Sequence, residues 1–334
     1  IWESLSARFV GELGGQPGVT PNIDRLAREG ILFTRVDCNS FRTDRGLVAL
    51  LSGYLAQPTT SVIRMTKKVP NLPALPRRFK EAGYDTMAVH GGDLTIFHKG
   101  EYYLTVGHDR VVGDKDLPKG LPSGKWGIHD GAVLDWIYDD IMDKTSKGRR
   151  WYTTFQTLSS HEPWIVPYTR LKDDEIANTF AYVDDAIGRF VDRLKKTPAW
   201  DSLLIVITGD HGCNTGQHLP ADRYAHIPLL MTGGAVKAPR RIDTIMSQTD
   251  TAATLLGQLG ISHDEFIFSR DVMAESYTYP FGFHTFVNGF MFRDATGYTV
   301  YDNVSDTATD SPDPDRERKG RIILQYLYED LARR

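Results

Sequence analysis

The sequence lacks the features of disulfide-stapled, membrane-spanning or nucleic-acid-binding proteins. Its 334 residues include two cysteines, Cys38 and Cys213, which are too few for a disulfide framework and indicate no redox compartment. No apolar run approaches the ~20 residues of a membrane-spanning helix, and no signal-peptide pattern opens the chain. A net charge of −4 provides no basic footprint for nucleic acid. The composition, 41% hydrophobic and 25% charged, is that of a globular protein.

The first residues, Ile1-Trp2, read as the end of a core strand that leads directly into Glu3-Ser4. A natural protein seldom starts inside a strand. We therefore expect a fragment whose upstream part, with membrane-embedded helices as one option, is not included.

The most informative stretch is an aliphatic run, residues 203–207, that ends in Gly209-Asp210-His211-Gly212. Such a run predicts a strand buried on both faces, as in a parallel sheet. Open α/β sheets bind ligands at the carboxyl ends of their strands. Carboxylate and imidazole there are good ligands for a divalent metal. The alternative is a strand-end turn with a solvated Asp210.

Strands and helices alternate through the first three quarters of the chain, which predicts a mostly parallel sheet with helices on both faces. The predicted strands are 1–5, 31–36, 84–90, 151–158, 203–207 and 227–231, and the predicted helices are 22–29, 46–51, 75–82, 130–144, 173–196 and 249–259. After Ser276, aromatic residues alternate with polar ones, which indicates antiparallel hairpins, followed by a polar loop at 306–315 and a helix at 322–331. We therefore predict an α/β catalytic domain at 1–275 and a small C-terminal β subdomain with a terminal helix at 276–334.

Several predicted strands are followed by polar residues that can converge on one edge of the sheet. They are Glu3, Thr43, Asp93, His161, Asp210 and His211. Thr43 is predicted at a helix N-terminus, where free N–H groups and the helix dipole attract an anion such as phosphate. A simple N-cap is the commoner use of Thr there, but a metal-bound hydroxyl can also act as a nucleophile.

These residues resemble the alkaline phosphatase superfamily, in particular its sulfatase-like branch with the lipoteichoic acid synthases (phosphoglycerol transferases) and, further off, the lipid A phosphoethanolamine transferases. The resemblance covers most of residues 1–260. The segments that carry it are 3–6 (Glu-Ser-Leu-Ser), 20–26 (Thr-Pro-Asn-Ile-Asp-Arg-Leu), 42–46 (Arg-Thr-Asp-Arg-Gly), 51–53 (Leu-Ser-Gly), 160–163 (Ser-His-Glu-Pro), 209–212 (Gly-Asp-His-Gly), 226–228 (His-Ile-Pro) and 247–250 (Ser-Gln-Thr-Asp).

The resemblance implies a role for each matching position. Glu3, Thr43, Asp210 and His211 match a single-metal site with Thr43 as nucleophile, and this ligand set suits Mn²⁺, with Mg²⁺ or Zn²⁺ as alternatives. The expected substrate-binding residues are His161, Lys99, Asp93, His226 and Trp164. Lys99 falls near an arginine of the synthases and would act as a point charge without the bidentate fork. For His161, His226 and Asp93 the alternative is a hydrogen-bonded loop residue.

A sulfatase activity is disfavoured by the sequence around the nucleophile. Sulfatases modify the cysteine of Cys-x-Pro-x-Arg, whereas Cys38 is followed by Ser at the third position. In sulfatases the modified residue lies ten positions before the Gly of Leu-x-Gly, and counting back from Gly53 gives Thr43. First-strand paired aspartates are also missing.

The resemblance implies transfer of a phosphoglycerol-type or phosphoethanolamine-type head group through a phospho-Thr43 intermediate. The expected partners are a phospholipid or other phosphodiester donor and a hydroxyl acceptor, at the extracytoplasmic face of the cytoplasmic membrane. A phosphodiesterase or phosphatase is the runner-up, because the metal ligands would be the same. A metal-free scaffold is the third reading, and an intact set of Glu3, Thr43, Asp210 and His211 argues against it.

Overall fold

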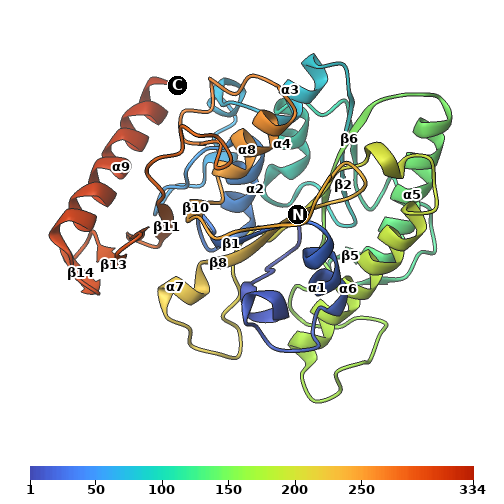
Figure 1. Ribbon diagram of the computed structural model, residues 1–334, viewed down its shortest axis with the longest axis horizontal. Coiled ribbons are helices and arrows are strands. Elements are labelled where there is room, and N and C mark those ends of the chain that lie inside the picture. The colour runs from blue at the N-terminus through green and yellow to red at the C-terminus, as the bar shows by residue number, and fades with distance from the viewer.

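Apolar strands form a mostly parallel central sheet in the computed structural model, which describes residues 1–334 (Figure 1). One part of the sheet is wholly parallel, with the order β3 (Arg110–Val112), β2 (Asp85–His90) and β6 (Trp151–Gln156). The other part has the order β10 (Met246–Ser247), β1 (Ile31–Asp37), β8 (His226–Thr232) and β7 (Ile205–Thr208), with β9 (Arg240–Ile242) also paired to β1. Only β8 runs antiparallel to its neighbours, so its first residue, His226, lies opposite Asp37 at the end of β1.

Ile1 and Trp2 join these two parts. The Ile1 amino group donates to Phe155 O at 2.7 Å, and Thr157 N donates to Ile1 O at 3.0 Å. On the other side, Trp2 N donates to Thr208 O at 2.8 Å, and the two segments pair in parallel. The chain start therefore lies in the middle of the sheet, as Figure 1 shows. Because Trp2 pairs in parallel with Gly209, Glu3 emerges at the same edge as the end of β7.

Helices cover both faces of the sheet (Figure 1). One layer holds α1 (Pro21–Glu29), α5 (Asp130–Ser146) and α6 (Glu175–Leu194), and the other holds α2 (Thr43–Ser52), α3 (Leu75–Glu81), α4 (Lys99–Thr105) and α8 (Asp250–Gln258). Aromatic side chains fill the first layer, where the Phe9 and Phe180 rings stack 3.9 Å apart. The predicted α/β class is confirmed. None of the helices combines the length and the apolar composition that crossing a membrane requires.

The C-terminal part forms a second, antiparallel sheet of β11 (Gly282–Phe286), β12 (Gly289–Asp294), β13 (Gly297–Asp302) and β14 (Thr307–Asp310). The terminal helix α9 (Pro314–Arg333) packs on it. The predicted loop at 306–315 was wrong where it contains β14, and the helix starts eight residues earlier than Ile322 because Asp313 caps it. Phe290 and Leu327 share a core with Leu47 of α2, and the domain boundary after 275 stays a prediction.

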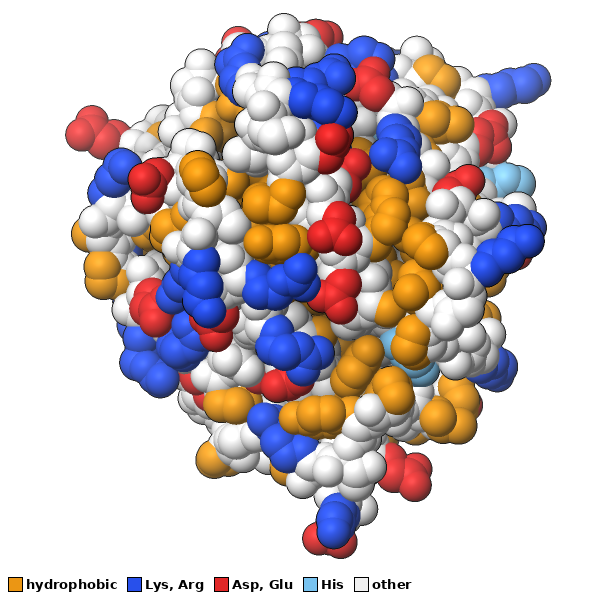
Figure 2. All heavy atoms as spheres, turned by 90° about the vertical axis from the view of Figure 1, so that its right-hand side faces the viewer, with side chains coloured by type: hydrophobic (Ala, Val, Ile, Leu, Met, Phe, Trp, Pro, Cys, Tyr) orange, Lys and Arg blue, Asp and Glu red, His pale blue; other side chains and the backbone are white.

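The strand before Asp210 is shorter than the sequence predicts. It starts at Ile205, and its first two residues are half-buried rather than enclosed on both faces. They line an apolar cavity of about 570 Å³ that also contacts Ile1 and β6. On the outer surface, basic and acidic side chains are interspersed on the face drawn in Figure 2, in keeping with the small net charge.

Asp184 of α6 holds the first turn of α1. Its carboxylate accepts hydrogen bonds from Asn22 N at 3.1 Å and Ile23 N at 2.8 Å. Thr20 precedes the helix as predicted, but its hydroxyl donates to Phe9 O and makes no capping bond. A carboxylate from another helix therefore satisfies the free N–H groups of α1.

The free energy of unfolding should depend on pH through Asp184. Burial raises the pKa of this carboxyl to about 6, above the ~3.9 of an unfolded Asp. The folded state thus binds the proton more tightly, and stability falls as the pH rises from about 4 to about 6. Asp184→Asn should remove this pH-dependent change in the free energy of unfolding, which is on the order of 2–3 kcal/mol. Urea denaturation across this pH range measures it.

Asp185→Asn is the matched control, because Asp185 is the next residue of α6, is partly exposed and pairs with Arg189. Its pH slope should match that of the wild type. Equal slopes for the wild type and Asp184→Asn would contradict the burial argument.

Candidate active site

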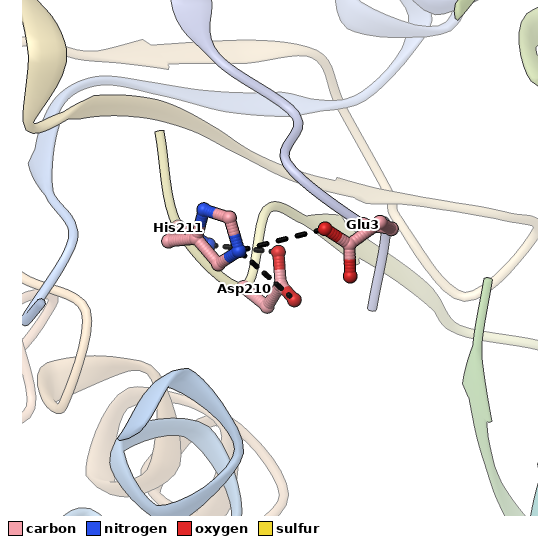
Figure 3. Close-up of side chains that lie close together, drawn as sticks. All are labelled: Glu3, Asp210 and His211. Atoms are coloured by element: carbon pink, nitrogen blue, oxygen red, sulfur yellow. Dashed lines mark hydrogen bonds and ion pairs between the residues drawn. The ribbon is translucent and has the colours of Figure 1, made fainter. Parts of the chain in front are cut away.

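Glu3, Asp210 and His211 lie together at the carboxyl edge of the sheet (Figure 3). The pairing of Trp2 with Gly209 aligns the two segments, and one ligand atom from each of the three side chains lies within 4.8 Å of the others. His211 Nε2 is 3.5 Å from Glu3 Oε1 and 3.8 Å from Asp210 Oδ2. Residues more than two hundred positions apart therefore meet where the sequence predicts.

Hydrogen bonds from neighbouring backbone and side-chain groups hold the Glu3 and Asp210 side chains. Ser4 N and His211 N each donate to Asp210 Oδ1 at 2.8 Å, and Ser4 Oγ donates to Glu3 Oε1 at 2.7 Å. Ser4 has a φ of 57°, a left-handed conformation that is uncommon for a residue with a side chain. The turn after the first strand thus aims a backbone N–H at Asp210, and the sequence did not predict this role for Ser4.

Thr43 is the first residue of α2, and its hydroxyl donates to Glu3 Oε2 at 3.1 Å. The N-cap position belongs to Arg42, and no side chain caps this helix. The reading of Thr43 as a simple N-cap is therefore wrong. Its hydroxyl faces the acidic cluster, while the N-terminal N–H groups of α2 supply partial positive charge beside it.

The three clustered side chains include two acids but only one group that can carry a positive charge. Burial raises the pKa of Asp210, and the charge of Glu3 raises it further. Burial alone would lower the pKa of His211, but the two carboxylates outweigh it and raise that pKa. Asp210 is fully buried, and its Oδ2 has no hydrogen-bond donor. Two buried acids with an unpaired oxygen fit a bound cation, which Glu3, Asp210 and His211 can hold with Thr43 next to them.

Lys99 and His161 come from two other segments, and their charges interact with the cluster. Lys99 begins α4 and is buried, with Nζ 2.7 Å from His90 Nε2. Burial lowers the pKa of Lys99 to about 8, against the opposing charges of Glu3 and Asp210. His161 is exposed, packs edge-on against Trp126 at 4.9 Å, and its charge acts on Glu3.

His90 is a residue that the sequence analysis did not single out. It ends β2, its Nδ1 is 3.0 Å from Gln156 O, and burial with the charge of Lys99 lowers its pKa to about 3. The neutral ring therefore donates through Nδ1 and accepts from Lys99 through Nε2. Its place at a strand end was the available signal.

The remaining predicted residues stand apart from the cluster. Asp93 forms a turn by accepting from Thr95 N at 2.8 Å, and the backbone of Trp164 donates to His161 O. His226 Nε2 is 2.7 Å from Thr34 O, on the far side of β8 from Glu3, Asp210 and His211. No hydrogen bond or ion pair joins Asp93, Trp164 or His226 to Glu3, Asp210 or His211.

Gly46 sets the distance between α2 and the cluster, because a Cβ at this position would lie 2.1 Å from Asp210 O. We expect Gly46→Ala to push α2 away, lower the free energy of unfolding by about 1–3 kcal/mol, and weaken metal binding. Denaturant unfolding and metal titration measure the two effects.

Gly257→Ala is the control, since the three atoms nearest to its Cβ all belong to the Asp271 side chain, which can rotate away, rather than to the backbone. Similar effects from both substitutions would show that close packing at Gly46 does not support the site.

Comparison with known proteins identifies the family. The model of the family described as Sulfatase matches residues 1–261. The chain is 27% identical over 302 residues to phosphoglycerol transferase I of Xanthomonas campestris pv. campestris, covering 82% of this chain and 42% of that protein. It is 22% identical over 349 residues to lipoteichoic acid synthase 2 of Bacillus subtilis, covering 92% and 53%. The chain thus spans about half the length of these curated relatives.

The fold agrees with this assignment. A crystal structure of a protein in the alkaline phosphatase superfamily from Vibrio parahaemolyticus has a TM-score of 0.85 and 24% identity, covering 99% of this chain and 86% of that chain. The family model covers more than half of the chain, so the chain belongs to the family described as Sulfatase.

Proposed function

We propose that this protein is a metal-dependent transferase that moves a phosphoglycerol-type or phosphoethanolamine-type head group through a phospho-Thr43 intermediate. The observation that carries the proposal is the hydrogen bond from the Thr43 hydroxyl to Glu3 at the N-terminus of α2. The names of two relatives, phosphoglycerol transferase I and lipoteichoic acid synthase 2, support the same head group. A location on the outer side of the cytoplasmic membrane belongs to this proposal.

The reaction would proceed by two displacements. Thr43 Oγ1 gives up its proton and attacks the phosphorus of the donor phosphodiester, the bond from phosphorus to the departing lipid alcohol breaks, and that alcohol takes up a proton. An acceptor hydroxyl then gives up its proton and attacks the phosphorus, the bond to Thr43 Oγ1 breaks, and Thr43 Oγ1 takes up a proton. Glu3 orients the nucleophile by accepting its hydrogen bond.

The metal would be held by Glu3, Asp210 and His211, with Thr43 as the adjacent fourth ligand. A divalent ion there lowers the pKa of a bound hydroxyl and offsets charge on the phosphoryl oxygens. We favour Mn²⁺, with Mg²⁺ or Zn²⁺ as alternatives, because the set combines oxygen and nitrogen ligands.

Lys99 and His161 would bind the phosphoryl group from outside the metal. Lys99 is a buried cation that interacts electrostatically with both Glu3 and Asp210. It is therefore suited to balance the negative charge of a phosphodiester. His161 is exposed, so it is accessible to a substrate. Asp93, His226 and Trp164 remain proposed substrate residues, although no hydrogen bond links them to the cluster.

Sulfate ester hydrolysis is disfavoured by the position of the cysteine. Cys38 is fully buried, with Sγ 3.5 Å from His284 Nδ1, and burial raises the pKa of its thiol. A buried, protonated thiol cannot serve as a surface nucleophile. The residue facing the acidic cluster is Thr43.

Substitution of Thr43 tests the mechanism. Thr43→Ala should abolish turnover of a labelled phospholipid donor, by at least about 10³-fold, because the attacking oxygen is gone. Thr43→Ser should retain part of the activity. Mass spectrometry of the wild-type protein after exposure to donor should find the head group on Thr43.

Thr254→Ala is the control, since this threonine lies in α8 and its hydroxyl contacts only the 270–272 segment. Near-native turnover by Thr43→Ala would overturn the proposal. Release of the head group into water in the presence of hydroxyl acceptors, without incorporation into them, would assign the same site to a hydrolase.

Metal analysis tests the ligand set. The purified protein should retain one divalent ion per chain, and Asp210→Asn should lower its metal affinity at least about tenfold because a charged ligand is lost. Asp222→Asn, a carboxylate outside the cluster, serves as the control. Equal metal content in all three proteins after dialysis against a weak chelator would contradict the assignment.

A further inference from the structure

A second cavity, which has a volume of about 610 Å³ and a mostly polar lining, lies beside the sheet and is not used by the proposed chemistry. The segment that contains the short helices η1 (Ala7–Phe9) and η2 (Gly11–Leu13) forms one wall, and the loop leading into α7 (Ala221–Tyr224) forms another; both elements are visible below β8 in Figure 1. Three of its fourteen lining residues are hydrophobic. Its volume is in the range of small-molecule sites, and its lining selects a polar ligand.

The cavity carries an excess of positive charge. Four arginines and two aspartates line it, which leaves a net charge of +2. Arg293 pairs with Asp37 at 2.8 Å, whereas Arg35 and Arg223 are exposed and form no ion pair. The cavity therefore differs from the molecule as a whole, whose net charge is −4.

Arg8 is fixed without losing its charge. Its guanidinium donates to the backbone oxygens of Cys213 at 3.3 Å and Thr215 at 3.0 Å. These carbonyls orient the side chain but do not neutralise it. Guanidinium groups recognise phosphate oxygens through paired N–H donors. A pre-oriented arginine beside two unpaired ones is suited to a phosphate-bearing ligand.

The cavity is connected to the active-site loop. The carbonyls that hold Arg8 belong to the segment that continues from His211, and Ser6 Oγ donates to His226 O at 3.4 Å. His226 lines the cavity with its ring held by Thr34 O. This accounts for the position of His226 away from the metal-ligating cluster.

We propose that this cavity is an anion-binding subsite for a phosphate ester of a polyol, bound by Arg8, Arg35 and Arg223. The assignment of that ligand as part of the acceptor or product rests on the proposed function, since both would carry polyol phosphates. Binding itself requires neither Thr43 nor turnover.

The test is calorimetric titration of metal-loaded Thr43→Ala protein with glycerol 1-phosphate, inorganic phosphate and glycerol. Glycerol 1-phosphate should bind most tightly and glycerol should not bind. Adding Arg35→Ala and Arg223→Ala should weaken glycerol 1-phosphate binding at least about tenfold, because two phosphate donors are lost. Equal affinity for inorganic phosphate would overturn the polyol part of the assignment.

The matched control carries Arg189→Ala and Arg318→Ala, which remove the same charge from exposed positions on α6 and α9. Its affinity should equal that of the parent protein. Equal weakening in both double variants, or none in either, would overturn the subsite. Turnover by Thr43→Ala would refute only the proposed mechanism, because the binding measurement does not depend on it.

Discussion

The site depends on the pairing of two residues, Ile1 and Trp2, between β6 and β7. Four backbone hydrogen bonds hold this short segment in the middle of the sheet. Because the segment and β7 run parallel, their carboxyl ends emerge at one edge, and Glu3 is placed beside Asp210 and His211. The backbone pairing of the sheet therefore determines where the cluster lies, and the side chains of Glu3, Asp210 and His211 determine its chemistry.

This placement brings two carboxylates close together in a buried site, where their mutual repulsion is costly. Glu3 and Asp210 are buried, and α2 approaches the Asp210 backbone so closely that a Cβ at Gly46 would not fit. Gln248 adds no charge, because its side-chain amide donates to the backbone oxygens of Gly209 and Asp210. His211 is therefore the only cationic partner within the cluster, and it is shared by two carboxylates. A site with such an excess of buried negative charge favours a divalent cation over a structural ion pair.

The sequence predicts the parts of the fold that follow from periodicity and strand-end chemistry. The alternation of elements, the helix starting at Thr43 and the convergence of Glu3 with Asp210-His211 all depend on local patterns joined by one rule about parallel strands. The reversed direction of β8, by contrast, follows from pairing between strands, and residues 226–232 read the same in either direction. Ser4 and His90 were missed because their roles depend on a φ angle and on a buried lysine across the site.

The connection between β1 and α2 places Cys38 and Thr43, which are close in sequence, in different environments. Cys38 follows β1 directly and packs against β11. There it contacts His284 and is inaccessible to solvent. Five residues further on, the chain has crossed the edge of the sheet and turned into α2, which presents Thr43 to Glu3. The length of this connection therefore decides which side chain faces the acidic cluster. Because α2 is held by Gly46 on one side and by a buried core on the other, a shift of one residue would rotate the first helical position by about 100° and remove the hydroxyl from the site. The nucleophile is thus determined by register as much as by residue type.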